Sequence, residues 1–294
     1  MILMDDWEKA GKLTYEVLEY GKSLIKIDAN VFSVIEKIEE KIKELEVKPA
    51  FPVQVSINEI AAHFIPLSKD LIFKKDDLVK LDVGISVNGK IGDSALSVDL
   101  GNNKDLIKAS EYALQEAIKV TKLGIKISKI GETIEESIRS KGFRVIKNLS
   151  GHEIKEYEEH SGLTIPNYDN DDDTKLKKGQ IIAIEPFATT GSGYVEDGKE
   201  SGIYKIINIK NVRNDITKDV LKYIVEEYKT LPFSKIWLLK KFPEFKVNFA
   251  LRIMEKENIL YQYKQLIEKS REKVSQAEHT LFIDDEIKIL TKQF

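Results

Sequence analysis

Two aspartates on neighbouring predicted strands are the first residues whose spacing suggests chemistry. Asn88-Gly89 separates two apolar segments, and this dipeptide favours a two-residue hairpin turn. The numbers of paired residues then add up to 177, so Asp93 faces Gly84. Asp82 lies diagonally to Asp93 on the same face, about 7 Å away, where two like charges repel unless a cation neutralises them. A divalent-cation site and an open, solvated sheet face both fit this pattern.

Histidine and glutamate side chains beside further predicted strands extend the pattern. The four histidines of the chain are His63, His152, His160 and His279. A lone histidine is more often structural than a ligand, but His152, Glu185 and Glu278 each lie next to a strand end, where side chains can converge. Four carboxylates and one imidazole would make a hard, anionic site that suits manganese, iron, cobalt or zinc, often as a pair.

Two competing metal motifs fail at residues that their chemistry needs. Residues 152–156 imitate the helical zinc motif with two histidines, but position 156 is Glu. The acidic run from 169 begins like a calcium loop, but Thr174 stands where the turn needs Gly, and Gln180 where a bidentate Glu is needed. A solvated acidic loop is the better interpretation of that run.

The elements that must position these residues form a repeated order. Apolar residues at helical spacing predict two amphipathic helices in the first 45 residues, followed by strands at 51–57, 77–87 and 90–100. Helices near 104–122 and 128–141 and strands near 143–150, 180–188 and 274–283 follow. The repeat suggests a duplicated α+β unit. The halves share no sequence identity, so an unduplicated α+β sheet explains the same order.

Residues 205–263 differ from the rest in pattern and charge. They predict short helices and carry 12 basic and 7 acidic side chains, a net charge of +5, which leaves −8 for the rest. No Gly/Ser-rich linker separates independent domains. We therefore expect a single domain over 1–294 with a helical insert subdomain at 205–263.

Composition excludes several classes of protein. The 294 residues carry a net charge of −3 and are 42% hydrophobic, which argues against a disordered chain and an obligate nucleic-acid binder. The absence of cysteine excludes disulfides and cysteine nucleophiles. The chain has no apolar run long enough to span a membrane, and its start lacks the basic flank of a signal peptide. These features predict a cytoplasmic protein, by default a monomer.

Six short segments, in this order and with these gaps, resemble the methionine aminopeptidases. They are residues 58–63, 80–84, 91–95, 151–160, 183–191 and 278–280. The 93 residues from Glu185 to Glu278 match the size of the helical insert of the type II enzymes. A short N-terminal region resembles the archaeal form.

The resemblance implies a pita-bread fold of two pseudo-twofold-related halves that hold two divalent ions. The ligands at the matching positions would be Asp82, Asp93, His152, Glu185 and Glu278. Water held between the ions would attack the peptide bond, with Glu185 as general base. The implied activity is removal of the N-terminal methionine from nascent proteins and peptides with a small second residue.

The resemblance also assigns residues to substrate binding. His63 and His160 would position the substrate and stabilise the tetrahedral intermediate. Phe51 would line the methionine pocket, and Ile203 takes a pocket position that is His in some relatives, which changes the shape of the pocket. His279 has no ligand role in this mapping, so it is expected to be structural or to support a ligand.

Three alternatives follow from the same residues. Prolidase and aminopeptidase P use the same five ligands, but they carry a substantial extra N-terminal domain, and about 50 residues precede Phe51. Catalytically inactive relatives that serve as binding proteins lose ligands, whereas all five are present here. The basic insert could dock weakly on ribosomal RNA near emerging chains, but a solvated lysine-rich face over a small helical core is the simpler hypothesis.

Overall fold

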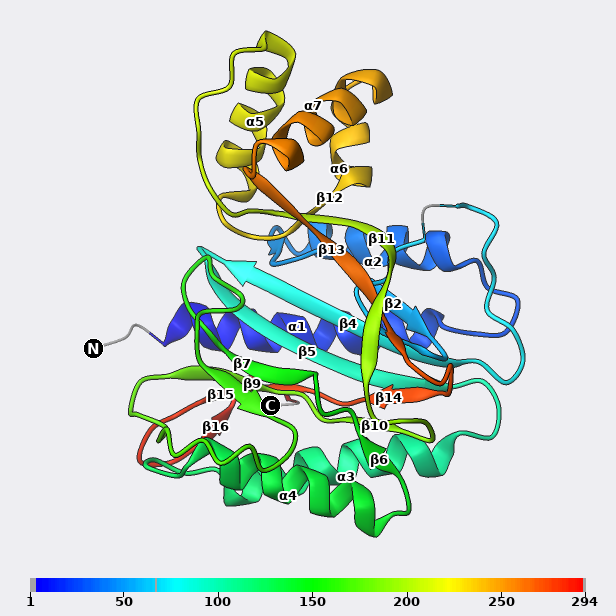
Figure 1. Cartoon of the computed structure of the whole chain (residues 1–294), viewed down its shortest axis with the longest axis vertical. Coiled ribbons are helices and arrows are strands. Elements are labelled where there is room, and N and C mark those ends of the chain that lie inside the picture. Colours follow the sequence, from blue (N-terminus) through cyan, green and yellow to red (C-terminus); the bar gives the residue numbers. More distant parts are fainter. Residues whose placement is uncertain (1–3, 67, 293–294) are drawn as a thin grey trace.

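The strands of the molecule lie between two pairs of helices, and a third group of helices projects from one end (Figure 1). The computed structural model describes residues 4–66 and 68–292. The first helix pair is α1 (Asp5–Leu24) and α2 (Val31–Glu44), and the second is α3 (Lys104–Val120) and α4 (Ile127–Ser140). Within these described ranges, none of the helices combines the length and apolar content that crossing a lipid bilayer requires.

The first half packs α1 and α2 against a four-stranded sheet. The sheet contains β1 (Lys48–Pro49), β2 (Gln54–Ile57), β4 (Leu78–Val87) and β5 (Lys90–Asp99). Helix α1 buries Ala10, Thr14 and Val17, the three- and four-residue spacing of one helical face. Gly92 lets α1 approach β5 closely, because a Cβ there would lie 2.7 Å from the α1 backbone. The predicted helices and the strands at 77–87 and 90–100 are confirmed, whereas the segment predicted at 51–57 is a strand only over β2.

The β4–β5 hairpin has the predicted register. Asn88 and Gly89 form its turn with φ values of 50° and 87°, the left-handed conformation that such a turn requires. Asp93 pairs with Gly84, and Asp82 pairs with Ala95. The two aspartates therefore lie diagonally on one face of the sheet, as the sequence predicts.

The second half repeats the arrangement with α3 and α4 over two small sheets. One sheet has the order β16-β15-β9-β7-β8 and the other β14-β10-β6. Their strands are β6 (Arg144–Val145), β7 (Ser150–Ile154), β8 (Thr164–Pro166), β9 (Ile181–Ile184), β10 (Phe187–Thr189), β14 (Val274–Gln276), β15 (His279–Phe282) and β16 (Lys288–Ile289). Helix–helix–strand order occurs twice, so the duplicated α+β arrangement is confirmed.

Three strands predicted as continuous are interrupted, and this corrects the sequence analysis. The segment 180–188 breaks at Glu185-Pro186, since proline lacks the N–H that a central strand needs. The segment 274–283 breaks at Glu278, whose N–H donates to Ala95 O at 2.9 Å, on β5. The segment 143–150 divides into β6 and β7, and His152 lies within β7 rather than after a strand.

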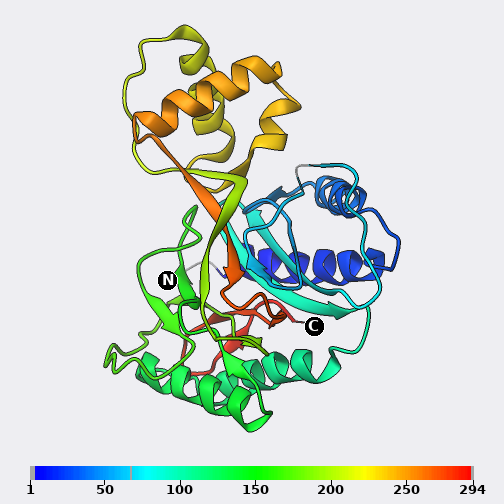
Figure 2. The same cartoon turned by 45° about the vertical axis from the view of Figure 1, so that its right-hand side comes forward.

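The projecting helices α5 (Asp215–Tyr228), α6 (Lys235–Leu239) and α7 (Glu244–Lys256) enclose their own apolar core (Figure 2). The antiparallel strands β11 (Val195–Ile206) and β13 (Leu260–Glu268) connect them to the body and form a sheet with β12 (Phe233–Ser234) and β3 (Ile60–Ala62). Trp237 Nε1 donates to Glu39 Oε1 of α2 at 2.6 Å, which ties the helices to the first half. The ends of the predicted insert, 205–206 and 260–263, belong to β11 and β13.

Candidate metal centre and substrate pocket

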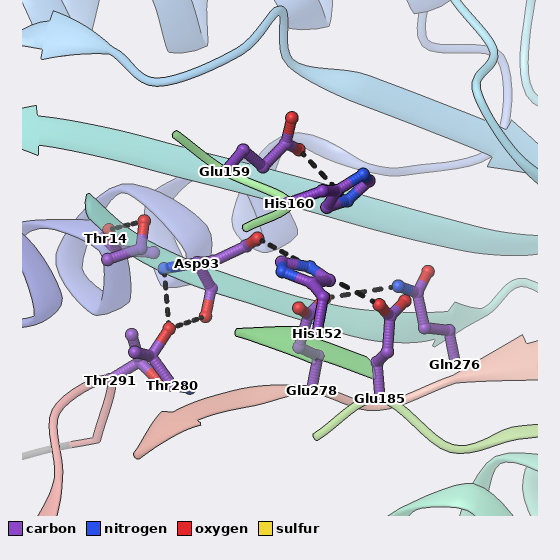
Figure 3. Close-up of polar contacts among 11 residues, drawn as sticks. Thr14, Asp93, His152, Glu159, His160, Glu185, Gln276, Glu278, Thr280 and Thr291 are labelled. Carbon is purple, nitrogen blue, oxygen red and sulfur yellow. Dashed lines mark hydrogen bonds and ion pairs between the residues drawn. The ribbon is translucent and has the colours of Figure 1, made fainter. Parts of the chain in front are cut away.

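Acidic and imidazole side chains from both halves converge at one buried point (Figure 3). Asp93, His152 and Glu278 each offer a ligand atom, and these atoms lie within 4.8 Å of one another. His152 Nε2 is 3.6 Å from both Asp93 Oδ2 and Glu185 Oε1. Asp82 approaches from the neighbouring strand β4, although the tightest group among the described residues does not include it.

Hydrogen bonds between β5 and β15 fix the position of two of these carboxylates. The Thr280 hydroxyl accepts from the Asp93 N–H at 2.9 Å and donates to the Asp93 carbonyl at 2.7 Å. The Ser94 hydroxyl donates to the Glu278 carbonyl at 2.6 Å. Asp93 and Glu278 are thus held to each other through the backbone, although 185 residues separate them.

Two side-chain amides form hydrogen bonds with Glu185 and Glu278, and the sequence analysis identified neither amide. Asn167 is fully buried, and its Nδ2 donates to Glu185 O at 3.1 Å. Gln276 Nε2 donates to Glu278 Oε2 at 3.3 Å. Gln276 precedes Glu278 by two residues, a spacing that could have suggested a shared face. Nothing in the sequence near Asn167 indicates its contact.

The electrostatics of the cluster are unfavourable without a cation. Burial, the charge of Glu159 and a smaller opposing effect of Gln276 give Asp82 a pKa of about 8. Burial first, and then the neighbouring carboxylates, raise the pKa values of Asp93, Glu185 and Glu278 well above the ordinary range. Burial holds the pKa of His152 well below its usual value, so its imidazole is neutral.

This donor set fits a divalent metal ion. Asp82 Oδ1, Asp93 Oδ1 and His152 Nδ1 are buried without a hydrogen-bond partner. Unpartnered buried oxygens and mutually repelling carboxylates are costly, and a cation removes both costs. Carboxylate oxygens with a neutral imidazole are ligands that first-row divalent metals accept.

A pocket beside this centre brings together four residues predicted for substrate binding. Phe51, His63, His160 and Ile203 line it, together with Gln54, Glu159, Pro232 and Tyr263. Phe51 packs over Gly84, where a Cβ would lie 2.3 Å from the Phe51 ring, so this close approach needs glycine. Phe51 and Ile203 are each 2% exposed.

His63 is fixed in one tautomer by its surroundings. Its Nδ1 lies 3.1 Å from the Lys264 carbonyl, which can only accept, so Nδ1 carries the hydrogen. Burial lowers the pKa of His63 to about 4, which leaves Nε2 as an acceptor. The His63 backbone N–H donates to Gln54 Oε1 at 2.7 Å, and the centroid of the His63 ring lies 4.9 Å from that of the Tyr263 ring in an edge-on contact.

His160 lies between the pocket and the metal centre. Its ring centroid is 4.1 Å from that of His152. Burial and, to a smaller extent, the charge of Lys205 lower its pKa to about 4. Its Nε2 is 3.9 Å from Glu159 Oε1 (Figure 3). Glu159 was not singled out from the sequence, where it reads as one of several acidic residues in the segment 153–159.

His279 lies outside both groups. Its Nδ1 is 3.0 Å from the Thr291 hydroxyl, which also accepts from the Thr280 N–H at 3.0 Å. These contacts hold β15 to the C-terminal segment, which is a structural role.

The fold and the cluster define a class, the pita-bread metallopeptidases. A crystal structure of methionine aminopeptidase from Thermotoga maritima matches with a TM-score of 0.71 and 26% identity, over 99% of this chain and 96% of that one. The model of metallopeptidase family M24 matches residues 5–220.

Within that class, the chain belongs to the methionine aminopeptidases of metallopeptidase family M24. The methionine aminopeptidase of Pyrococcus abyssi is 41% identical over 293 residues, which are 99% of both chains. The methionine aminopeptidase of Archaeoglobus fulgidus is 42% identical over 278 residues, or 94% of both chains. The family resemblance that the sequence motifs predict is confirmed, and the prolidase alternative is not favoured.

Proposed function

We propose that this chain removes the N-terminal methionine from nascent proteins and peptides whose second residue is small. The observation that carries the proposal is the convergence of Asp93, His152, Glu185 and Glu278 directly beside a pocket lined by Phe51 and Ile203. Such an arrangement offers a cation site next to an apolar slot, as cleavage after a methionine side chain requires.

We propose five metal ligands, Asp82, Asp93, His152, Glu185 and Glu278. Their four carboxylates carry four negative charges, which two divalent ions would balance, and cobalt, manganese, iron and zinc suit these donors. When bound, the ions supply Lewis-acid activation of the carbonyl and lower the pKa of water. The metal requirement of the family supports this assignment.

The remaining chemistry belongs to the protein side chains. Glu185 would take a proton from the attacking water and deliver it to the departing amine, as general base and then acid. His160 would contact the reacting carbonyl oxygen, where negative charge develops. His63, neutral and protonated on Nδ1, would present Nε2 as an acceptor to the substrate amide. Phe51 and Ile203 would form the walls around the methionine side chain.

We propose a single catalytic domain over 1–294, with 205–263 as its helical insert subdomain. The ligands come from both halves, so neither half holds the site alone. The insert helices have a separate apolar core, which supports a subdomain. A cytoplasmic monomer is our working assignment.

Weak docking of the insert on the ribosome is a second proposal. The insert carries a net charge of +5, which favours contact with a polyanion, and its exposed apolar side chains include Ile209 and Phe245, each 65% exposed. We expect salt-sensitive co-sedimentation with ribosomes that is lost when the insert helices are deleted. Equal co-sedimentation of the deletion variant, or none by the full chain, would refute docking.

The first test of activity is methionine release from Met-Ala-Ser and Met-Ile-Ser by metal-free protein titrated with manganese or cobalt. We expect metal-dependent release from the alanine peptide and little from the isoleucine peptide. A proline-containing dipeptide serves as the control for the prolidase alternative. No release under any metal, or faster cleavage of the proline dipeptide, would overturn the proposed function.

A further inference from the structure

Lys205 is a half-buried lysine at the mouth of the substrate pocket that the proposed chemistry does not use. It follows Ile203 by two residues on β11, so the two side chains share a face of the strand. The register pairs Lys205 with Tyr261 of β13, whose ring centroid lies 5.3 Å from that of Tyr263. Exposure rises along this face, from 2% at Ile203 and 8% at Tyr263 to 46% at Tyr261. The pocket therefore opens toward Lys205, at the end of the two strands next to the insert (Figure 2).

The ammonium group of Lys205 forms no ion pair with a carboxylate among the described residues. Glu200, on the same strand, pairs instead with Lys264 Nζ at 3.4 Å, and Glu159 of the pocket has its ion-pair contact with a histidine. Lys205 Nζ lies over the Tyr263 ring, 5.5 Å from its centroid. A contact of this kind is weak where water reaches the cation. The positive charge is therefore able to bind an anion that enters the pocket mouth.

The third residue of a substrate is the first whose side chain can reach this ammonium group. The Tyr263 ring centroid is 5.5 Å from Lys205 Nζ and 4.9 Å from the His63 ring centroid, so Nζ lies at most about 10 Å from the His63 ring. His63 would face the substrate amide, whose nitrogen belongs to the small second residue. In an extended chain the third Cα lies about 5 Å beyond that nitrogen, and a glutamate side chain adds about as much. The charge of Lys205 also acts within the pocket, because it adds to the lowering of the His160 pKa that burial causes.

We infer that Lys205 binds an acidic side chain at the third residue of the substrate, so that the enzyme favours peptides with glutamate or aspartate at that position. This inference rests on the proposed function, because His63 at the substrate amide sets the direction of the chain. An ion pair at a partly exposed site adds modest binding energy, but its sign follows both charges. A neutral third residue would leave the ammonium group over the Tyr263 ring and gain nothing from it.

The test compares two peptide amides, Met-Ala-Glu-Ser and Met-Ala-Gln-Ser, which differ in one charge and carry no terminal carboxylate. Methionine release by the manganese-loaded protein gives kcat and KM for each peptide, with wild type and Lys205→Met. We expect wild type to have a kcat/KM about threefold higher for the glutamate peptide, through a lower KM, and the variant to have a ratio near one. Added salt should reduce the wild-type ratio, because it screens an exposed ion pair.

A charge reversal and a matched control isolate the effect. Lys205→Glu should invert the preference, so that the amide of Met-Ala-Lys-Ser becomes about threefold better than the glutamate peptide. Lys108→Met removes the same charge at an exposed residue of α3, outside the pocket, and should keep the wild-type ratio.

Three results would overturn the inference. They are equal kcat/KM for the glutamate and glutamine peptides in wild type, a wild-type ratio in Lys205→Met, or no inversion in Lys205→Glu. A loss by the same factor for both peptides leaves the ratio unchanged, and it would limit Lys205 to the charge balance of the pocket itself. Failure of the proposed function gives a different pattern, because wild type would then release no methionine from either peptide.

Discussion

At the scale of single residues, the carboxylate of Glu185 would serve two roles, as a metal ligand and as the general base. It lies 3.6 Å from His152 Nε2 within the metal centre, and burial together with the charges of Asp82 and Glu159 raises its pKa well above the ordinary range. A cation nearby favours the ionised form that a general base needs. The role of Glu185 therefore depends on its charge rather than on its size.

Glu185→Gln tests that role, because the amide keeps the shape of the carboxylate but replaces one acceptor oxygen with an NH2 donor and cannot act as a base. We expect kcat for Met-Ala-Ser to fall by about a hundredfold or more, while the circular dichroism spectrum stays that of wild type. Exposed Glu158→Gln is the matched control. Turnover close to wild type in the Glu185 variant would exclude it as the base.

Residues differ in how far the sequence reveals them. Asp82 and Asp93 could be placed on one face because a two-residue turn determines the register of its own hairpin. Glu159 could not be placed, since the pocket that it lines also contains Phe51, His63 and Tyr263 from distant segments. Gln276 is close to Glu278 in the sequence, but the contacts of both residues with β5 depend on how the two halves pack against each other.

At the scale of elements, Glu268 at the end of β13 holds the loop that follows β10 in place through hydrogen bonds. Its buried carboxylate accepts from the N–H and hydroxyl groups of Ser192 and Ser270. Gly191 is required beneath it, because a Cβ there would lie 2.5 Å from the carboxylate. Burial alone would raise the pKa of Glu268, but the hydrogen bonds from Ser192 and Ser270 outweigh it and lower the pKa to about 2.

The pH dependence of stability follows from that shift. The folded-state pKa lies below the unfolded value of about 4.5, so the stabilisation is present above about pH 4.5 and is lost as the pH falls toward about 2. We expect Glu268→Gln to lower the free energy of unfolding at pH 7 by about 2 kcal/mol. The difference from wild type should shrink below pH 4.5.

Urea unfolding of both proteins from pH 3 to 7 measures this difference in free energy of unfolding, with exposed Glu257→Gln as control. If the difference in free energy of unfolding between the two proteins did not change with pH, the ionised Glu268 carboxylate would not be the source of the stabilisation.

The predicted elements succeed where local pattern decides and fail where another segment intervenes. Amphipathic periodicity located α1 to α4, because each buries one face against a sheet. The break at Glu278 was not predicted, since it depends on the hydrogen bond from Glu278 N to Ala95 on β5. That break nevertheless places the carboxylate in the site.

At the scale of the whole molecule, the metal centre joins the two halves. Asp82 and Asp93 come from the β4–β5 hairpin of the first half, and His152, Glu185 and Glu278 come from the sheets of the second (Figure 1). Each half contributes negative charge at the seam, so the halves repel there until a cation binds. An ion held by the proposed ligands would therefore cross-link the halves as well as serve as a cofactor.

This arrangement predicts that metal binding stabilises the entire fold. A ligand present at a hundred times its Kd for the folded state adds about 2.7 kcal/mol to the free energy of unfolding, which for a chain of this size raises Tm by about 4 °C. We expect that shift when manganese is added to chelator-treated wild type in a calorimetric melt. Asp93→Ala removes a proposed ligand of the first half and should abolish most of the shift, whereas Glu158→Gln at an exposed residue should retain it. If manganese raised the Tm of the Asp93 variant as much as that of wild type, metal binding would not depend on the first half, and the proposed cross-link would be excluded. Because the comparison is between melts with and without metal for each variant, any change that the substitution causes in the metal-free protein cancels.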